Sequence, residues 1–191
     1  REWIDRNTTK RRQKAAKQFL EEKNVWPLIV AGDSSEIPAF SPDLANLYRL
    51  ITQRRPKVVL ELGVGFSTLV ISAALRSNLD EANVRGHLYS VDSEIKWIEN
   101  TTQKIPSDLR KFVSFHHSSV SVKMIDYTLC HMYESLPDIS PNFVYVDGPS
   151  VGPRANIRGD IHGLSFSSDR SVVGADVLLF ESSAPLDFFI L

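Results

Sequence analysis

From Lys57 onward, short apolar runs alternate with segments of helix length, and few folds accommodate this pattern. The expected strands are Lys57–Leu62, His87–Val91, Phe112–His116, Phe143–Val146 and Val177–Phe180. The expected helices between them are Ser67–Leu79, Glu94–Lys104 and Val120–Glu134. Alternating strands and helices form a mostly parallel sheet through right-handed crossovers, with helices on both faces. The sequence therefore predicts an α/β, doubly wound fold that binds ligands at the carboxyl ends of its strands.

Two further helices are expected before this pattern begins. Lys10–Lys23 is a basic segment of strong helix formers, and a second helix opens at Ser41, which we expect as its N-cap, and ends before Pro56. We expect residues 1–40 to form a basic helix and connector, and residues 41–191 to form the α/β domain. Residues 148–174 lack strong periodicity and are expected to form a long functional loop, with a short helix around 155–161.

Composition narrows the class of protein further. The chain has 191 residues, of which 42% are hydrophobic and 24% charged, and this composition is typical of an ordinary globular protein. Its formal net charge of −1 gives no general attraction to nucleic acid. Its one cysteine, Cys130, rules out an internal disulfide and favours a reducing, cytoplasmic location. No apolar run is long enough for a membrane helix. We therefore expect neither membrane nor nucleic acid as a partner, whereas a homo-oligomer remains open.

The most informative segment runs from Val58 to Thr68, where a buried strand leads directly into Gly63-Val64-Gly65 and then into a helix. Glycine permits a sharp turn and the close approach of a ligand to the backbone. The free N–H groups at the start of the next helix add positive potential. An ordinary strand-to-helix turn without a ligand is the alternative.

Two nucleotide chemistries use such a turn. A dinucleotide fingerprint needs a third glycine, where this chain has Thr68, and an acid about 20 residues further on. The first acid at a strand end is Asp92, twenty-nine residues after Gly63, and it could equally cap the helix near Glu94. Glu61, just before the turn, would repel a diphosphate and attract an ammonium or sulfonium ion. The residues thus favour a cationic ligand without phosphate.

These residues resemble the class I S-adenosylmethionine-dependent methyltransferases, which carry an acid-x-Gly-x-Gly-x-Ser/Thr motif after their first strand. The resemblance runs from Ser41 to Ala184 and includes Asp92 after the second strand and Asp147-Gly148-Pro149 after the fourth. It implies a Rossmann-like sheet with strand order 3-2-1-4-5, lacking the last two of the family's seven strands. It also implies S-adenosylmethionine as cofactor and a small-molecule acceptor, methylated at oxygen.

The resemblance also assigns roles to individual residues. Asp147 would be the catalytic residue, as a base or by orienting the acceptor, although it could also simply cap the turn. Asp92 would accept hydrogen bonds from both ribose hydroxyls. The rest of the cofactor would be bound by the other motif residues and by the serines that follow strands two and three. These residues are Glu61, Gly63, Gly65, Phe66, Ser67, Thr68, Ser93, Ser118 and Ser119.

Three other interpretations remain open. Glu181-Ser182-Ser183 stands where the metal-dependent branch of the family has an Asp-Asn pair, so no metal is expected. An NAD(P)-dependent oxidoreductase would use a related fold. A non-catalytic module would use the basic segment Lys10–Lys17 to bind RNA or a partner, but no aromatic residues are interleaved with its charges.

Overall fold

The computed structural model describes residues 2–30, 41–125, 128–148 and 176–179 of the chain. Its elements, in chain order, are α1 (Glu2–Glu22), α2 (Trp26–Val30), α3 (Ser41–Arg54), β1 (Val58–Leu62), α4 (Phe66–Ala82), β2 (His87–Asp92), α5 (Ile95–Lys104), α6 (Ser107–Arg110), β3 (Val113–His117), β4 (Val120–Ile125), β5 (Thr128–Tyr133), β6 (Phe143–Val146) and β7 (Asp176–Leu179).

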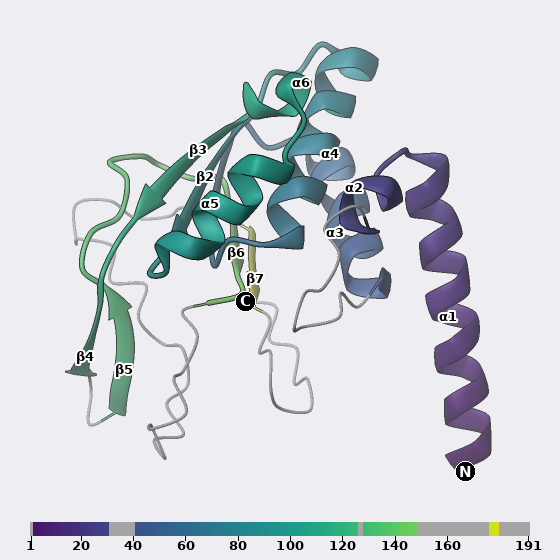
Figure 1. Ribbon diagram of the computed structural model, residues 1–191, viewed down its shortest axis with the longest axis horizontal. Coiled ribbons are helices and arrows are strands. Elements are labelled where there is room, and N and C mark those ends of the chain that lie inside the picture. The colour runs from purple at the N-terminus through teal and green to yellow at the C-terminus, as the bar shows by residue number, and fades with distance from the viewer. Residues whose placement is uncertain (1, 31–40, 126–127, 149–175, 180–191) are drawn as a thin grey trace.

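Five of these strands form one parallel sheet in the order β3-β2-β1-β6-β7 (Figure 1). The predicted α/β, Rossmann-like topology is confirmed, because β6 and β7 are the fourth and fifth strands of the expected order 3-2-1-4-5. In the middle of the sheet, Glu61 of β1 lies opposite Ser90 of β2 on one side and Tyr145 of β6 on the other. This register brings one carboxyl and two hydroxyl side chains together near the carboxyl edge.

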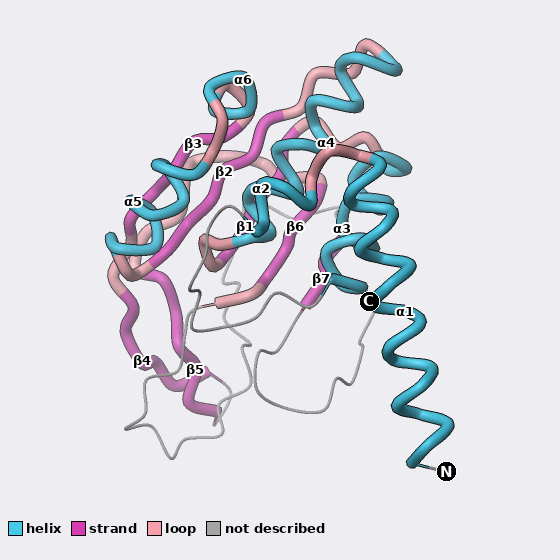
Figure 2. Tube along the Cα trace, turned by 45° about the vertical axis from the view of Figure 1, so that its right-hand side comes forward, coloured by secondary structure: helices cyan, strands magenta, loops and turns pink. Residues whose placement is uncertain are grey.

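The helix expected over 120–134 is wrong, because β4 and β5 form an antiparallel hairpin there. Val120 pairs with Tyr133, and Ile125 pairs with Thr128. The β-branched residues Val120 and Val122 alternate with polar residues, and this two-residue period suits a strand better than a helix. The hairpin extends beyond the end of the parallel sheet (Figures 1 and 2).

Successive residues of the central strands β1, β2 and β6 face two different cores. Val59, Leu88, Phe143 and Tyr145 belong to the larger core, which also contains buried residues of α1, α2, α3, α4 and α6. Leu60, Leu62, Val91, Val144 and Val146 form a smaller core on the opposite face, against Tyr133, Leu136 and Ile139. The described helices thus lie on the face of the larger core, as Figure 2 shows for α3, α4 and α5. A helix around 155–161 would fall outside the described residues.

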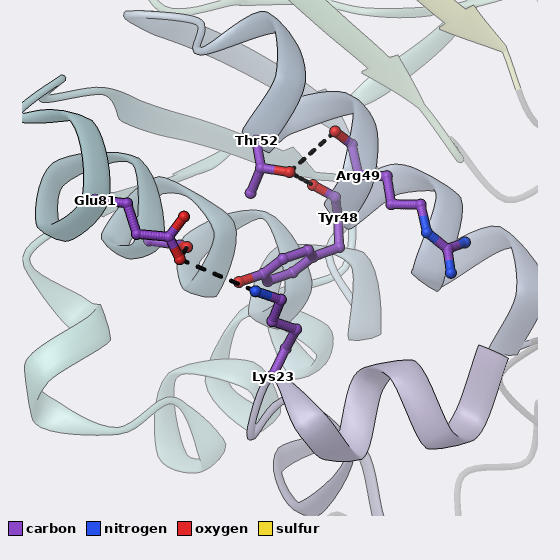
Figure 3. Close-up of polar contacts among 6 residues, drawn as sticks. Lys23, Tyr48, Arg49, Thr52 and Glu81 are labelled. Atoms are coloured by element: carbon purple, nitrogen blue, oxygen red, sulfur yellow. Dashed lines mark hydrogen bonds and ion pairs between the residues drawn. The ribbon is translucent and has the colours of Figure 1, made fainter. Parts of the chain in front are cut away.

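Helix α1 is joined to the rest of the fold through its C-terminal half. Ala16 and Leu20 are buried in the core with Tyr48 of α3, whereas the N-terminal half extends away from the sheet (Figure 1). Just after α1, Lys23 Nζ lies 4.0 Å from Glu81 Oε1 near the end of α4 (Figure 3). The predicted boundary between residues 40 and 41 stays a prediction, and residues on both sides of it contribute to one core.

Candidate functional site at the carboxyl ends of the central strands

Three adjacent strands, β1, β2 and β6, end side by side at one edge of the sheet. Gly63 N donates to Val91 O over 2.8 Å, and Asp147 N donates to Leu62 O over 2.7 Å, so the pairing continues to the last residue of each strand. The chain after β1 continues to β2, on one side, and the chain after β6 continues to β7, on the other. Ligands of doubly wound sheets bind at such a point of reversal, which here lies between β1 and β6.

Position 63 requires glycine for two reasons, the backbone conformation there and the close approach of the chain at the end of β6. Its φ is +101°, and a Cβ built on it would lie 2.8 Å from the carbonyl carbon of Asp147. A Cβ on Gly148 would likewise lie 3.0 Å from Gly63 Cα. The two chain segments touch through their glycines, so the space at Gly63 is taken by backbone and not by a ligand.

Gly65 has different surroundings. Its φ of −176° is extended backbone that any residue adopts, and no atom of the described residues beyond its chain neighbours lies within 4 Å of a Cβ built on it. It precedes α4, which begins with the partly exposed Phe66 and the buried Ser67, at 2% exposure. The open side of the turn therefore lies at Gly65, beside the unpaired N–H groups of a helix N-terminus.

Glu61 is fully buried beneath this turn, on the face covered by α4. Its Oε2 accepts a hydrogen bond from Thr68 Oγ1 at 2.6 Å and a shorter one from Ser90 Oγ. Its Oε1 is buried without a hydrogen-bond partner within the described part of the chain. Burial raises the pKa of Glu61 to about 7, although the nearby hydroxyls of Ser67, Ser90 and Thr68 favour the carboxylate.

Asp92 links the glycine turn to the start of α5. Its Oδ2 accepts from Val64 N and its Oδ1 from Glu94 N, both at 2.8 Å. The second contact is made to Glu94, which is itself the N-cap of α5, so Asp92 is not the N-cap that the alternative expected and instead stabilises the turn before the helix. Burial raises the pKa of Asp92, and the backbone donors oppose that shift. A carboxylate offers about four acceptor positions, so two remain for a ligand.

The serines after β2 and β3 contribute mainly to local structure. Ser118 N donates to Asp92 O at 3.0 Å, and the Ser118 hydroxyl accepts from Ser135 N at 2.9 Å. Ser119 O accepts from Glu134 N at 2.8 Å. Ser93 lies between Asp92 and Glu94 at the turn into α5. These contacts fix the base of the hairpin next to the strand ends.

Asp147 follows β6 at the same edge. It retains exposed surface, yet desolvation of its carboxyl group raises its pKa to about 6, with a smaller contribution from Asp43 at the start of α3. A proton acceptor with a pKa in this range is partly ionised near neutrality. Asp147 is therefore suited to exchange a proton with a ligand at this edge.

Sequence reasoning missed Tyr133, because its segment was expected to be helical. A Cβ on Gly148 would lie 3.2 Å from the Tyr133 hydroxyl, which is buried without a partner among the described residues. Burial, followed by the charges of Asp92, Glu61 and Asp147, raises its pKa and keeps the phenol neutral. The alternation of β4 and β5 would have indicated strands, but no pattern in the sequence indicated that Tyr133 reaches the site.

The chain matches no protein-family model and no curated protein sequence. Among solved structures, it is similar to the O-methyltransferase TomG from Streptomyces achromogenes in complex with SAM, at 16% identity over 72% of this chain, with a TM-score of 0.42. It is also similar to the SAH-bound methyltransferase PaMTH1 from Podospora anserina, at 14% identity over 78% of this chain, with a TM-score of 0.45. The matches cover 53% and 58% of those two chains.

The charge of this edge determines what it can attract. Glu61, Asp92 and Asp147 lie at the ends of three adjacent strands, and within the described ranges none of them forms an ion pair with a basic side chain. Carboxylates without cationic partners attract a cation and repel an anion. The described residues contain no group of three or more His, Cys, Asp or Glu side chains that could hold a metal ion. No described helix meets the length and apolarity needed to cross a membrane.

Proposed function

We propose that this chain binds S-adenosylmethionine at the carboxyl ends of β1 and β2 and transfers its methyl group to a small molecule, at oxygen. The observation that carries the proposal is the set of three carboxyl groups, Glu61, Asp92 and Asp147, at the carboxyl ends of three adjacent strands, none of which forms an ion pair with a described residue. Such a site suits a nucleoside that carries a sulfonium and an ammonium group, and it disfavours a diphosphate.

The described residues fit this cofactor at three points. Asp92 keeps two acceptor positions, which suit the two ribose hydroxyls. The open space at Gly65 admits a ligand against the backbone. The unpartnered Oε1 of Glu61 supplies negative charge beneath the turn, toward the methionine end. Phe66, Ser67 and Ser93 border this region, and Ser118 and Ser119 would lie on the adenine side.

When bound, the cofactor supplies a methyl group that is activated as a leaving group from a sulfonium. Transfer is an in-line displacement, so the protein contributes by aligning the acceptor, excluding water and accepting a proton. Asp147 would take the proton of the acceptor hydroxyl as the new carbon–oxygen bond forms and the carbon–sulfur bond breaks. Its pKa of about 6 leaves it ionised enough at neutral pH for this role.

Calorimetry with S-adenosylhomocysteine and with NADH on the same sample tests the proposal. We expect binding of the first compound only, and a loss of about 10- to 100-fold in affinity for Asp92→Ala, because hydrogen bonds to a charged group contribute roughly 1.5–3 kcal/mol. Asp80→Ala is the matched control, since Asp80 is an exposed carboxylate in the last turns of α4.

The outcomes separate the competing functions. Binding of NADH alone would support the oxidoreductase. Binding of neither compound would favour a non-catalytic module, for which salt-dependent retention on RNA would have to disappear when residues 1–23 are deleted. For the methyl transfer itself, Asp147→Asn should retain S-adenosylhomocysteine binding and lose most of the transfer from a labelled methyl donor in a metabolite screen.

A further inference from the structure

A continuous chain of hydrogen bonds connects Ser90 in β2 to the glycine turn. Ser90 Oγ donates to Glu61 Oε2, and Thr68 Oγ1 donates to the same oxygen at 2.6 Å. Gly65 N in turn donates to Thr68 Oγ1 at 3.1 Å. Ser90, Glu61 and Thr68 are each fully buried, so solvent does not compete for the two bonds to Glu61, whereas the bond from the partly exposed Gly65 is only part-buried.

The direction of each bond in this chain is determined by the donor and acceptor capacity of the groups. A threonine hydroxyl has one proton, and in Thr68 that proton is donated to the Glu61 carboxylate. The lone pairs of the Thr68 hydroxyl are then free to accept from Gly65 N. A proton on Oε2 would turn this acceptor into a donor, and a proton on Oε1 would leave Oε2 a weaker, uncharged acceptor, so in either case the hydroxyl of Thr68 would be held less firmly in this orientation. The position of the Gly65 amide is thus linked to the ionisation of Glu61.

We propose that Thr68 and Ser90 are positioning residues, which act through the Glu61 carboxylate to hold the Gly65 amide in the conformation that receives the cofactor. This inference rests on the proposed function for the identity of the ligand, whereas the hydrogen-bond chain itself does not. Thr68 stands where a dinucleotide fingerprint has its third glycine, and at this position it takes the part that Glu or Gln has in a capping box.

Of the groups that act on Glu61, the two tyrosines stay neutral, whereas Asp147, with a pKa of about 6, titrates just below Glu61. Tyr145 lies beside it on β6, and burial, followed by nearby carboxylates, raises the pKa of Tyr145, so that the phenol stays neutral. The Tyr133 phenol is held neutral in the same way. Asp147 is the charged group whose repulsion acts on Glu61, and it raises the pKa of Glu61 further.

Two readouts on the full chain test the inference. The first is the backbone amide signal of Gly65 in a nuclear magnetic resonance pH titration without ligand, together with the titration of the Glu61 side-chain carboxyl carbon. The second is the affinity for S-adenosylhomocysteine at about pH 6 and about pH 8. The variants are Thr68→Val, which has nearly the same shape, Thr68→Ser, which keeps the hydroxyl, and Ser90→Ala. Ser72→Ala is the matched control, because Ser72 is a fully buried serine of α4 whose hydroxyl has no partner in the described structure.

In the unmodified chain, the Gly65 signal should titrate with the Glu61 carboxyl, with a midpoint near the pKa of about 7. Thr68→Val should abolish the response of Gly65 and weaken binding about tenfold at the higher pH, as expected for the loss of one buried hydrogen bond. Thr68→Ser should restore both. Ser90→Ala should move the midpoint to higher pH, and Ser72→Ala should change neither readout.

A Gly65 response that persists in Thr68→Val, or a midpoint unchanged in Ser90→Ala, would overturn the inference. If Thr68→Val fails to fold, the midpoint in Ser90→Ala decides the question. If the unmodified chain does not bind S-adenosylhomocysteine while Gly65 titrates as described, the proposed cofactor is wrong and the hydrogen-bond chain stands.

Discussion

Substituting alanine at Gly63 and at Gly65 should separate stability from ligand binding within one turn. At Gly63, alanine would have to adopt a φ of +101° and place its Cβ 2.8 Å from the carbonyl carbon of Asp147. The unfavourable φ costs about 1–3 kcal/mol, and a forced contact in packed surroundings costs a further ~1–3 kcal/mol. Because the opposing atoms are backbone atoms of a sheet strand end, little relaxation is available. We expect Gly63→Ala to lower the free energy of unfolding by about 2–6 kcal/mol.

Gly65→Ala should behave in the opposite way. The backbone there is extended and the Cβ would enter open space, so the folded state bears no strain, and the reduced freedom of the unfolded chain adds roughly 0.4–1 kcal/mol of stability. The same methyl group would occupy the space that we assign to the ligand, and S-adenosylhomocysteine affinity should fall at least tenfold.

Urea denaturation of both variants, with calorimetry on the folded protein, provides the test. Equal destabilisation by the two substitutions would refute the assignment of Gly63 to packing and of Gly65 to binding. So would unchanged affinity in a stable Gly65→Ala variant, because the open space beside Gly65 would then be ordinary solvent.

Two further predictions concern stability. The pKa of Glu61 in the folded state, about 7, exceeds its usual value of 4.5, so the folded state binds more protons than the unfolded chain between these pH values. The free energy of unfolding should therefore fall as the pH rises through that window. Glu61→Gln should remove up to roughly 3 kcal/mol of this fall, as measured by urea denaturation at about pH 5 and pH 8. Phe143 of β6 is 1% exposed, and Phe143→Ala should lower the free energy of unfolding by about 3–5 kcal/mol. Val122 of the hairpin is 49% exposed, and Val122→Ala should change it by less than about 0.5 kcal/mol. Comparable losses in denaturant titrations would contradict the division into a buried core and an exposed hairpin.

The order of the central strands could be predicted because each is a short apolar run followed by a turn or a helix signal. Val58–Leu62 and Phe143–Val146 are buried along almost their whole length, and continuous apolar runs are typical of strands covered on both faces. Right-handed crossovers then leave few arrangements of the remaining strands. The same rules located Glu61, Asp92 and Asp147 at one edge of the sheet, since they follow or end adjacent strands.

The hairpin at 120–133 could not be predicted from the alternation of strands and helices alone. Those rules expect a helix after the third strand, and this expectation outweighed the β-branched, two-residue period of Val120 and Val122. The error also concealed Tyr133, because a helix would have pointed that residue elsewhere. Local propensity was the better guide here, since the hairpin forms a separate two-stranded sheet with its own hydrogen bonds.

The roles of individual side chains within the turn depended on contacts that a linear pattern does not contain. No pattern in the sequence distinguished Gly63, which touches the end of β6, from Gly65, which faces space free of described residues. Thr68 is expected to touch the ligand by resemblance, yet its hydroxyl is engaged between Glu61 and Gly65 N. Ser41, expected as a helix N-cap, donates its hydroxyl to the Gln13 carbonyl of α1 over 3.3 Å. Each of these results reflects a long-range packing neighbour.

A crystal structure of the chain with S-adenosylhomocysteine tests the central claim most directly. The account predicts a nucleoside on the open side of Gly65, with both ribose hydroxyls within hydrogen-bond distance of Asp92 and the sulfur facing Asp147. Electron density for the ligand at another place, or protein atoms filling the space between Gly65 and Asp92 with the ligand excluded, would contradict it.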